Sequence, residues 1–160
     1  MFSAMTTFTK VHVVISLIGI FGGFVVAFGL LTAKRLDGWT ALFLITTVLT
    51  SVTGFFFPFH GFTPAIGVGI LSLVVLAIAI FARYGRKLAG AGRWIYAVTA
   101  MLALYLNFFV LIVQLFQKVP ALKALAPTQS EPPFAVAQLA ALVIFVVLTV
   151  FAAIRFRPSS

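Results

Sequence analysis

Five long apolar runs follow one another along the chain, separated by short polar segments. They cover Val11–Thr32, Trp39–Phe57, Pro64–Ala82, Trp94–Gln117 and Phe134–Ile154. Each run is close to the roughly 20 residues that a helix needs to cross the hydrocarbon core of a bilayer. Open strands would leave backbone groups unpaired in lipid, and the runs lack the polar alternation of barrel strands. The pattern predicts an all-α bundle of five transmembrane helices in one domain, 1–160.

The composition supports lipid as the surrounding solvent. Of the 160 residues, 63% are hydrophobic and only 8% are charged, which is more apolar surface than a small soluble domain can bury. The first run is longer than the apolar part of a signal peptide, and its basic pair Lys34-Arg35 follows it instead of preceding it. We therefore expect a retained span. The absence of cysteine excludes disulfides and thiolate chemistry.

The distribution of positive charge predicts an orientation. The net charge is +9, which in this setting indicates membrane topology and not nucleic-acid binding, because basic residues near span ends set orientation. One set of loops holds eight basic residues, namely Lys34, Arg35, Arg83, Arg86, Lys87, Arg93, Arg155 and Arg157. The other side holds three, Lys10, Lys118 and Lys123. The prediction is an N-terminus outside and a cytoplasmic C-terminus, and Trp39, Tyr84, Trp94 and Tyr96 fall at that same basic interface.

Two loops have a composition that suggests a role. The outer loop, 118–133, contains four prolines that prevent a continuous helix, and its apolar half, Val119–Ala126, suits a short amphipathic turn at the interface.

The basic run RYGRKLAGAGR lies on the cytoplasmic side. Juxtamembrane cations attract anionic lipid headgroups, so we expect headgroup contacts from Arg83, Arg86, Lys87 and Arg93.

Small and hydroxyl residues indicate how the helices pack. In lipid, helices associate through small residues and interhelical polar contacts. The first run presents a stripe of small residues, Ser16, Gly19, Gly23 and Ala27. The second presents Thr46, Thr50 and Thr53 on one face, with Thr47, Ser51 and Gly54 beside it. These hydroxyls either line a polar path or bond their own i−4 carbonyls, and we favour the second interpretation.

The polar residues of the outer side form the candidate site. With the predicted topology, this side holds His12, His60, Glu131, Gln114, Lys118 and Gln138. Two imidazoles on one face suit haem b, or a transition metal with Glu131 as a third ligand. The histidines lack a close motif, however, and an interfacial histidine needs no ligand. We therefore predict no metal site.

Tyr105 and Asn107 lie inside the fourth run. They suit a hydrogen-bonding pair for a quinone or a lipid headgroup, or else interhelical hydrogen bonds, which we favour. Because they are two residues apart, they project in different directions and cannot form one compact site alone.

Three segments carry a family resemblance. GWTALFLITTVLTSVTGFFFP, GRWIYAVTAMLALYLN and ALAPTQSEPPF together resemble a family of small, uncharacterised polytopic bacterial inner-membrane proteins. The resemblance covers most of the chain from the second run onward, and APTQSEPPF is its most specific piece. It implies a bacterial inner-membrane location and no activity, cofactor or functional residue.

These observations favour a non-catalytic protein. The sequence shows no nucleophile–base–acid set, no pair of carboxylates on one face and no inverted repeat of the transporter kind. We expect a subunit or accessory protein of a membrane complex, which contacts other membrane subunits or itself through helix faces and the outer loop. The alternatives are a haem b- or quinone-binding redox module at the periplasmic face, and a small oligomeric channel or transporter lined by the threonine face.

Overall fold

All regular elements in the described part of the chain are helical. The computed structural model describes residues 7–34, 36–56, 64–85, 88, 90–128 and 130–156. In chain order the elements are α1 (Thr7–Leu31), α2 (Asp37–Gly54), α3 (Pro64–Ile80), the π-helical turn η2 (Phe81–Gly85), α4 (Gly92–Lys118), α5 (Pro120–Leu125) and α6 (Pro132–Arg155). The all-α class is confirmed, and each of the five predicted runs forms a helix.

Four helices are long and apolar enough to cross a membrane. They contain the candidate spans Lys10–Leu31, Ile66–Gly85, Gly92–Phe116 and Pro132–Arg155, as expected of a multi-pass membrane protein. The predicted second span, α2, is not among these candidates. It has 18 residues and includes Asp37, five threonines and a serine, so it is the least suited of the five to face lipid all round.

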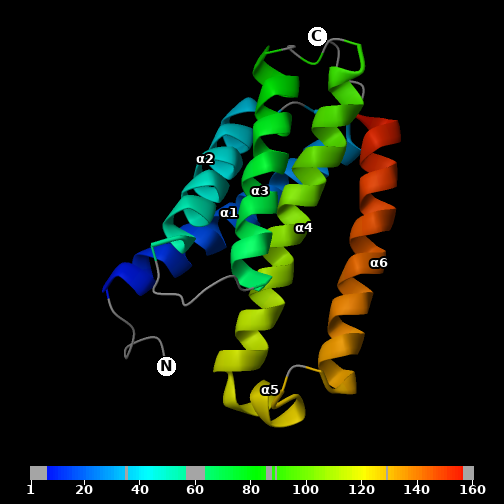
Figure 1. Ribbon diagram of the computed structural model, residues 1–160. Coiled ribbons are helices and arrows are strands. Elements are labelled where there is room, and N and C mark those ends of the chain that lie inside the picture. The colour runs from blue at the N-terminus through cyan, green and yellow to red at the C-terminus, as the bar shows by residue number, and fades with distance from the viewer. Residues whose placement is uncertain are drawn as a thin grey trace.

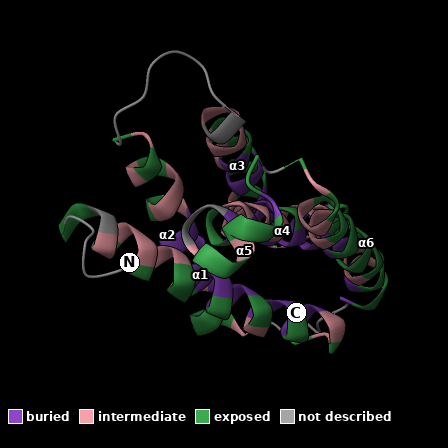
Figure 2. Ribbon diagram, turned by 90° about the horizontal axis from the view of Figure 1, so that it is seen from below, coloured by how far each residue is buried: buried purple, intermediate pink, exposed green. Residues whose placement is uncertain are grey.

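The five long helices run alternately in opposite directions (Figure 1). In the view of Figure 1, α3 and α6 run upward, α2 and α4 run downward, and α1 crosses obliquely from the lower left toward the upper right, while α5 lies at the lower end between α4 and α6. Seen from below, α4 lies between α3 and α6, and α2 lies beside α1 (Figure 2). The central position of α4 explains why it also contacts α1.

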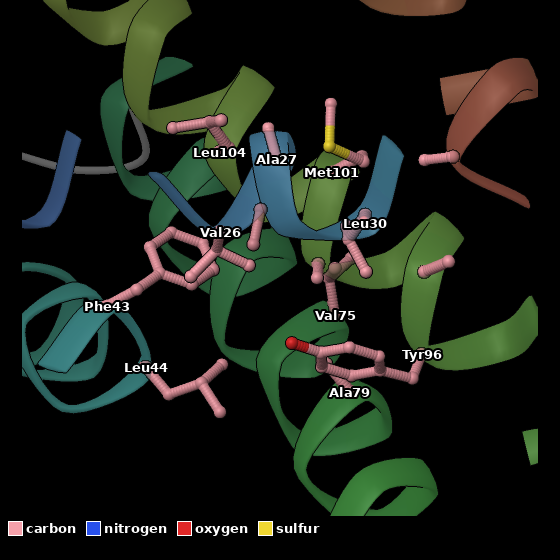
Figure 3. Packing of buried hydrophobic residues seen from close by; sticks show 14 of the residues in the cluster. Val26, Ala27, Leu30, Phe43, Leu44, Val75, Ala79, Tyr96, Met101 and Leu104 are labelled. Carbon is pink, nitrogen blue, oxygen red and sulfur yellow. The ribbon is translucent and has the colours of Figure 1, made fainter. Parts of the chain in front are cut away.

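One hydrophobic core joins the long helices, and its close-up shows side chains from α1 to α4 (Figure 3). Its most buried members include Leu30, Phe43, Leu76 and Leu104, each at most 3% exposed. Large apolar side chains elsewhere on the helices point outward, as they do where lipid is the solvent. Helix α6 is the most peripheral, because only 11% of its span is buried against 44% for α1 and α4.

The prolines of the predicted outer loop set its helix boundaries. Pro120 begins α5 and Pro132 begins α6, because proline suits the first turn of a helix, where its missing N–H is not needed. The short apolar turn expected over Val119–Ala126 is thus the helix α5. Its predicted place at a membrane interface stays a prediction.

The glycine stripe of α1 packs inside the bundle. A Cβ on Gly23 would lie 2.4 Å from Leu104 Cδ1 of α4 and 3.0 Å from Phe43 Cε1 of α2. Ala27, one turn further along α1, is 5% exposed, while Ser16 donates to the Val13 carbonyl of its own helix (2.7 Å). The missing side chains therefore let α2 and α4 approach α1, and this face is not available to another protein.

A larger residue at Gly23 tests this close approach. Gly23→Val forces a branched side chain against Leu104 and Phe43, which are themselves buried, and overpacking of this kind lowers the free energy of unfolding by about 1–3 kcal/mol. The matched control is Gly38→Val on α2, where a Cβ meets nothing within 4 Å. We expect a lower thermal midpoint in lipid nanodiscs for the first variant only. Equal midpoints would show that α1 does not need glycine there.

Candidate functional site

His12 is tied to the end of α2. Its Nδ1 lies 2.7 Å from Thr53 Oγ1, and the Thr53 hydroxyl donates its own proton to the Leu49 carbonyl (2.6 Å). Since a hydroxyl has one proton, the ring must donate through Nδ1–H and Thr53 must accept. His12 thus joins α1 to α2 at the end of the bundle where α1 begins.

The predicted pairing of His12 with His60 lies outside the described residues, because His60 falls in 57–63. Within the described ranges, no group of three or more His, Asp or Glu side chains is placed to hold a metal ion. This observation bears on neither haem nor quinone, and the haem, metal and quinone interpretations stay predictions.

Glu131 closes a turn at the start of α6. Its carboxylate accepts from the backbone N–H of Thr128 (3.0 Å to Oε1) and from the Thr128 hydroxyl, which also contacts Ser130 Oγ (2.6 Å). These hydrogen bonds, led by the one from the Thr128 hydroxyl, hold the pKa of Glu131 below its usual value. The carboxylate is thus bonded within its own loop.

The described contacts of the other predicted site residues lie elsewhere. Gln114 is exposed, and Lys118 ends α4, with its side chain outside the described set. Gln138 donates to the Phe109 carbonyl of α4 (3.3 Å). The candidate outer-face site formed by these residues and Glu131 stays a prediction.

The threonines of α2 bond their own helix. Thr46 donates to the Leu42 carbonyl (2.6 Å), Thr50 to that of Thr46 (2.7 Å) and Thr53 to that of Leu49. Each of these hydroxyls thereby donates its proton to a backbone oxygen of its own helix. This geometry matches the back-bonding interpretation of the threonine face, and the conducting path stays a prediction.

Thr47 is an exception, and its Oγ1 and Asn107 Nδ2 both lie close to the position that a Cβ on Gly19 would take (3.2 and 3.6 Å). Thr47 is 2% exposed, and its Oγ1 has no hydrogen-bond partner among the described residues. The same holds for the buried Nδ2 of Asn107, whereas Tyr105 packs its ring on Phe145 of α6 at 5.5 Å between centroids. Tyr105 and Asn107 thus project in different directions. Sequence reasoning did not bring Thr47 and Asn107 together, although their similar depths in antiparallel helices are a usable signal.

The basic end of the bundle holds a buried arginine. Arg83, in the turn η2, has a side chain that is 1% exposed, and it forms an ion pair with Asp37 at the start of α2. Its guanidinium carbon lies 5.0 Å from the centre of the Tyr96 ring, within the range of a cation–π contact. A buried charge needs such partners, because its desolvation is otherwise unfavourable.

The predicted headgroup contacts change accordingly. Arg83 is enclosed by protein, and Arg93 donates to the Phe156 carbonyl at the end of α6 (2.7 Å), where a cation suits the free carbonyls of a helix terminus. Arg83 thus binds inside the bundle, whereas Arg93 is half-buried, and the predicted headgroup contact of Arg93 stays a prediction. Arg86 and Lys87 lie outside the described residues, so their predicted headgroup contacts stay predictions.

No family model matches this chain, and comparison with curated proteins and with solved structures gives no match either. The resemblance to an inner-membrane family therefore stays a prediction.

The hydrogen bonds at Glu131 predict that substitution of Thr128 changes the pKa of this carboxyl group. Thr128→Val removes the hydroxyl donor, so the pKa of Glu131 rises toward its ordinary value, while Thr128→Ser keeps the donor and the lowered pKa. The pKa of Glu131 is lower in the folded state than in the unfolded state. The stability that this turn gives to the folded protein is therefore fully present above the unfolded pKa, and it is lost as the pH falls through the folded pKa. Carboxyl 13C shifts of Glu131 followed against pH measure the difference. Identical titrations of the two variants would show that Thr128 does not stabilise the carboxylate.

Proposed function

We propose that the protein is a non-catalytic inner-membrane subunit that crosses the bilayer five times, with its N-terminus outside and its C-terminus in the cytoplasm. The spans are α1 to α4 and α6, and the loop between α4 and α6 forms the contact surface for a partner membrane protein. The orientation is supported by the excess of basic residues on one set of loops, and the bacterial inner membrane by the resemblance of APTQSEPPF and its companion segments.

The inclusion of α2 among the spans is supported by where its polar groups point. Thr40, Thr46 and Thr47 are buried inside the bundle, and Asp37 has Arg83 as its partner. The opposite face offers large apolar residues to the outside, which are Leu42, Ile45, Leu49 and Val52. A helix of mixed composition can cross lipid when its polar face is covered by neighbouring helices.

The observation that carries the subunit proposal is that the loop between α4 and α6 packs onto both helices, because its Ala126 and Leu122 join a second hydrophobic cluster whose other members lie on α4 and α6. Ala126 is 0% exposed, and this second cluster consists of Ile112, Phe116, Ala126 and Ala141, with Phe108, Leu122, Phe134 and Ala137 packed against it. A segment that merely joins two spans needs no such core, since connecting loops normally run over the surface. The cluster holds α5 and the Glu131 turn in fixed positions.

This fixed loop presents a mixed surface. Leu125 is 55% exposed, and Lys123, Thr128 and Ser130 are also exposed. An apolar residue surrounded by polar ones on an ordered segment suits a small protein contact. The partner that we propose is another integral membrane protein. Its extramembrane part on the outer side binds this surface while α5 stays folded.

Cysteine labelling tests the five-span topology. The chain has no cysteine, so the single variants Lys34→Cys and Ser130→Cys each report one exposed position. We expect a membrane-impermeant thiol reagent to label the Ser130→Cys variant in intact spheroplasts and the Lys34→Cys variant only after permeabilisation. If α2 does not cross the membrane, the two positions lie on the same side and show the same accessibility, which would overturn the proposal.

Site-specific photo-crosslinking tests the contact surface. A benzophenone amino acid replaces Leu125 on α5, and in the control it replaces Val143, which is 54% exposed on the apolar face of α6. In native membranes we expect a discrete adduct with a second membrane protein from position 125 and none from position 143. The absence of an adduct at position 125, or the same adducts from both positions, would count against a partner at the loop.

A further inference from the structure

Two exposed cations at the basic end of the bundle are not engaged by the described part of the protein. At this end Asp37 pairs with Arg83, and Arg93 donates to backbone carbonyls at the end of α6. Lys34, just after α1, and Arg155, the last residue of α6, are exposed, and the described residues give neither of them an ion pair or a side-chain hydrogen bond. Both side chains can therefore bind an anion from outside the protein.

These two cations belong to neighbouring helices that end on the same side of the bundle. Helices α1 and α6 both run toward the upper right of Figure 1, and they contact each other. The rings of Phe24 on α1 and Phe145 on α6 have a centroid separation of 6.1 Å. Each cation stands at or just beyond a helix C-terminus, where positive charge is favoured by the free carbonyl groups.

A tight turn fixes the position of Lys34. Its N–H donates to the Gly29 carbonyl (2.7 Å), and Ala33 before it has a positive φ of 59°. A Cβ on Gly29 would lie 2.6 Å from Leu36 Cδ1 and 3.0 Å from the Lys34 carbonyl oxygen, so glycine lets the turn fold back over α1. The Lys34 ammonium lies 6.0 Å from the centre of the Phe28 ring, which is the limit of a cation–π contact. Such a contact leaves its three N–H donors free for an anion.

The outward face of α1 next to Lys34 is lined by phenylalanine. Phe21, Phe24 and Phe28 are 43–64% exposed, and their spacing of three and four residues places them on one face of the helix. At 1.5 Å per residue this stretch covers about 10 Å, which fits within the roughly 15 Å of hydrocarbon in one leaflet. A free phosphate ion would not contact these rings. A phospholipid brings a phosphate and acyl chains to the same place.

We propose that an anionic phospholipid binds at this end of α1 and α6. Its phosphate accepts hydrogen bonds from the Lys34 ammonium, the Arg155 guanidinium is the second cation, and its acyl chains lie along Phe24 and Phe28. Charge complementarity supports this occupant, because this end holds eight of the eleven basic residues against one acidic residue, Asp37, and juxtamembrane cations attract anionic headgroups. The site is separate from the headgroup contacts predicted for the α3–α4 connection. It does not depend on the proposed partner at the α4–α6 loop.

Native mass spectrometry of the full chain tests the site. The protein is released from detergent micelles that contain equal amounts of phosphatidylglycerol and phosphatidylcholine, and we expect it to retain phosphatidylglycerol in preference. Lys34→Gln and Arg155→Gln are each expected to weaken the binding of the most tightly held phosphatidylglycerol about fivefold, whereas Lys34→Arg keeps it. The control Lys123→Gln removes an exposed charge on α5, at the opposite end of the bundle, and leaves the binding unchanged.

Three results of this experiment would overturn the proposal. Equal retention of the two lipids would show that the face takes up any lipid without recognising the headgroup. The same loss from Lys34→Gln and Lys123→Gln would show that only the total charge matters. A dimer without bound lipid would show that a second copy of the chain covers this face of α1.

A photoreactive acyl chain locates the lipid in bilayers without any substitution in the protein. Phosphatidylglycerol with a diazirine in its acyl chain is expected to form adducts on α1 at Phe24 and Phe28, which peptide mass spectrometry detects. The matched phosphatidylcholine is expected to label these positions about fivefold less, because its headgroup carries no net charge for Lys34 and Arg155 to attract. Equal labelling by the two lipids would contradict a site for an anionic headgroup.

Discussion

The polar face of α2 is the constraint on which the rest of the bundle depends. Lipid offers no hydrogen bond to Thr47, whose hydroxyl, unlike those of Thr46 and Thr50, does not bond its own helix in the described contacts, so α2 can lie in a membrane only when its neighbours cover that face. Helix α1 provides most of the cover, and it can do so because Gly19 and Gly23 carry no side chain where α2 and α4 approach. The position of α4 at the centre of the bundle follows from this close approach.

Helix α2 is held at three levels. At its start, Asp37 pairs with Arg83, which is buried against Tyr96. At its end, Thr53 accepts a hydrogen bond from His12 of α1. Between these points, Thr47 of α2 and Asn107 of α4 both approach Gly19 of α1. Contacts at both ends and in the middle fix the rotation of α2 about its own axis, which the apolar composition of the bundle would leave poorly defined. Helix α6 makes fewer such contacts and accordingly lies at the periphery.

The sequence predicts the helices well and the contacts between their polar groups poorly. Long apolar runs locate α1, α3, α4 and α6 because the thickness of the hydrocarbon core sets their length, and the prolines at 120 and 132 mark where α5 and α6 begin. Asp37, by contrast, lies beside Lys34 and Arg35 in the sequence and yet pairs with Arg83, which is 46 residues away. Helices that are apolar on most faces give little indication of which face meets a neighbour. The partners of Arg83, Arg93 and Gln138 therefore depend on packing that no run of residues reveals.

Spin labels along the outward face of α2 test the central claim most directly, namely that this helix crosses lipid with its polar face covered. Single cysteine substitutions of Leu42, Ile45 and Leu49, all exposed on that face, carry the labels, and power saturation measures their collisions with oxygen and with a water-soluble nickel complex. The account predicts high oxygen accessibility and low nickel accessibility at all three positions, with the largest difference at Ile45, near the middle of α2. Free access of the nickel complex to position 45 would contradict it.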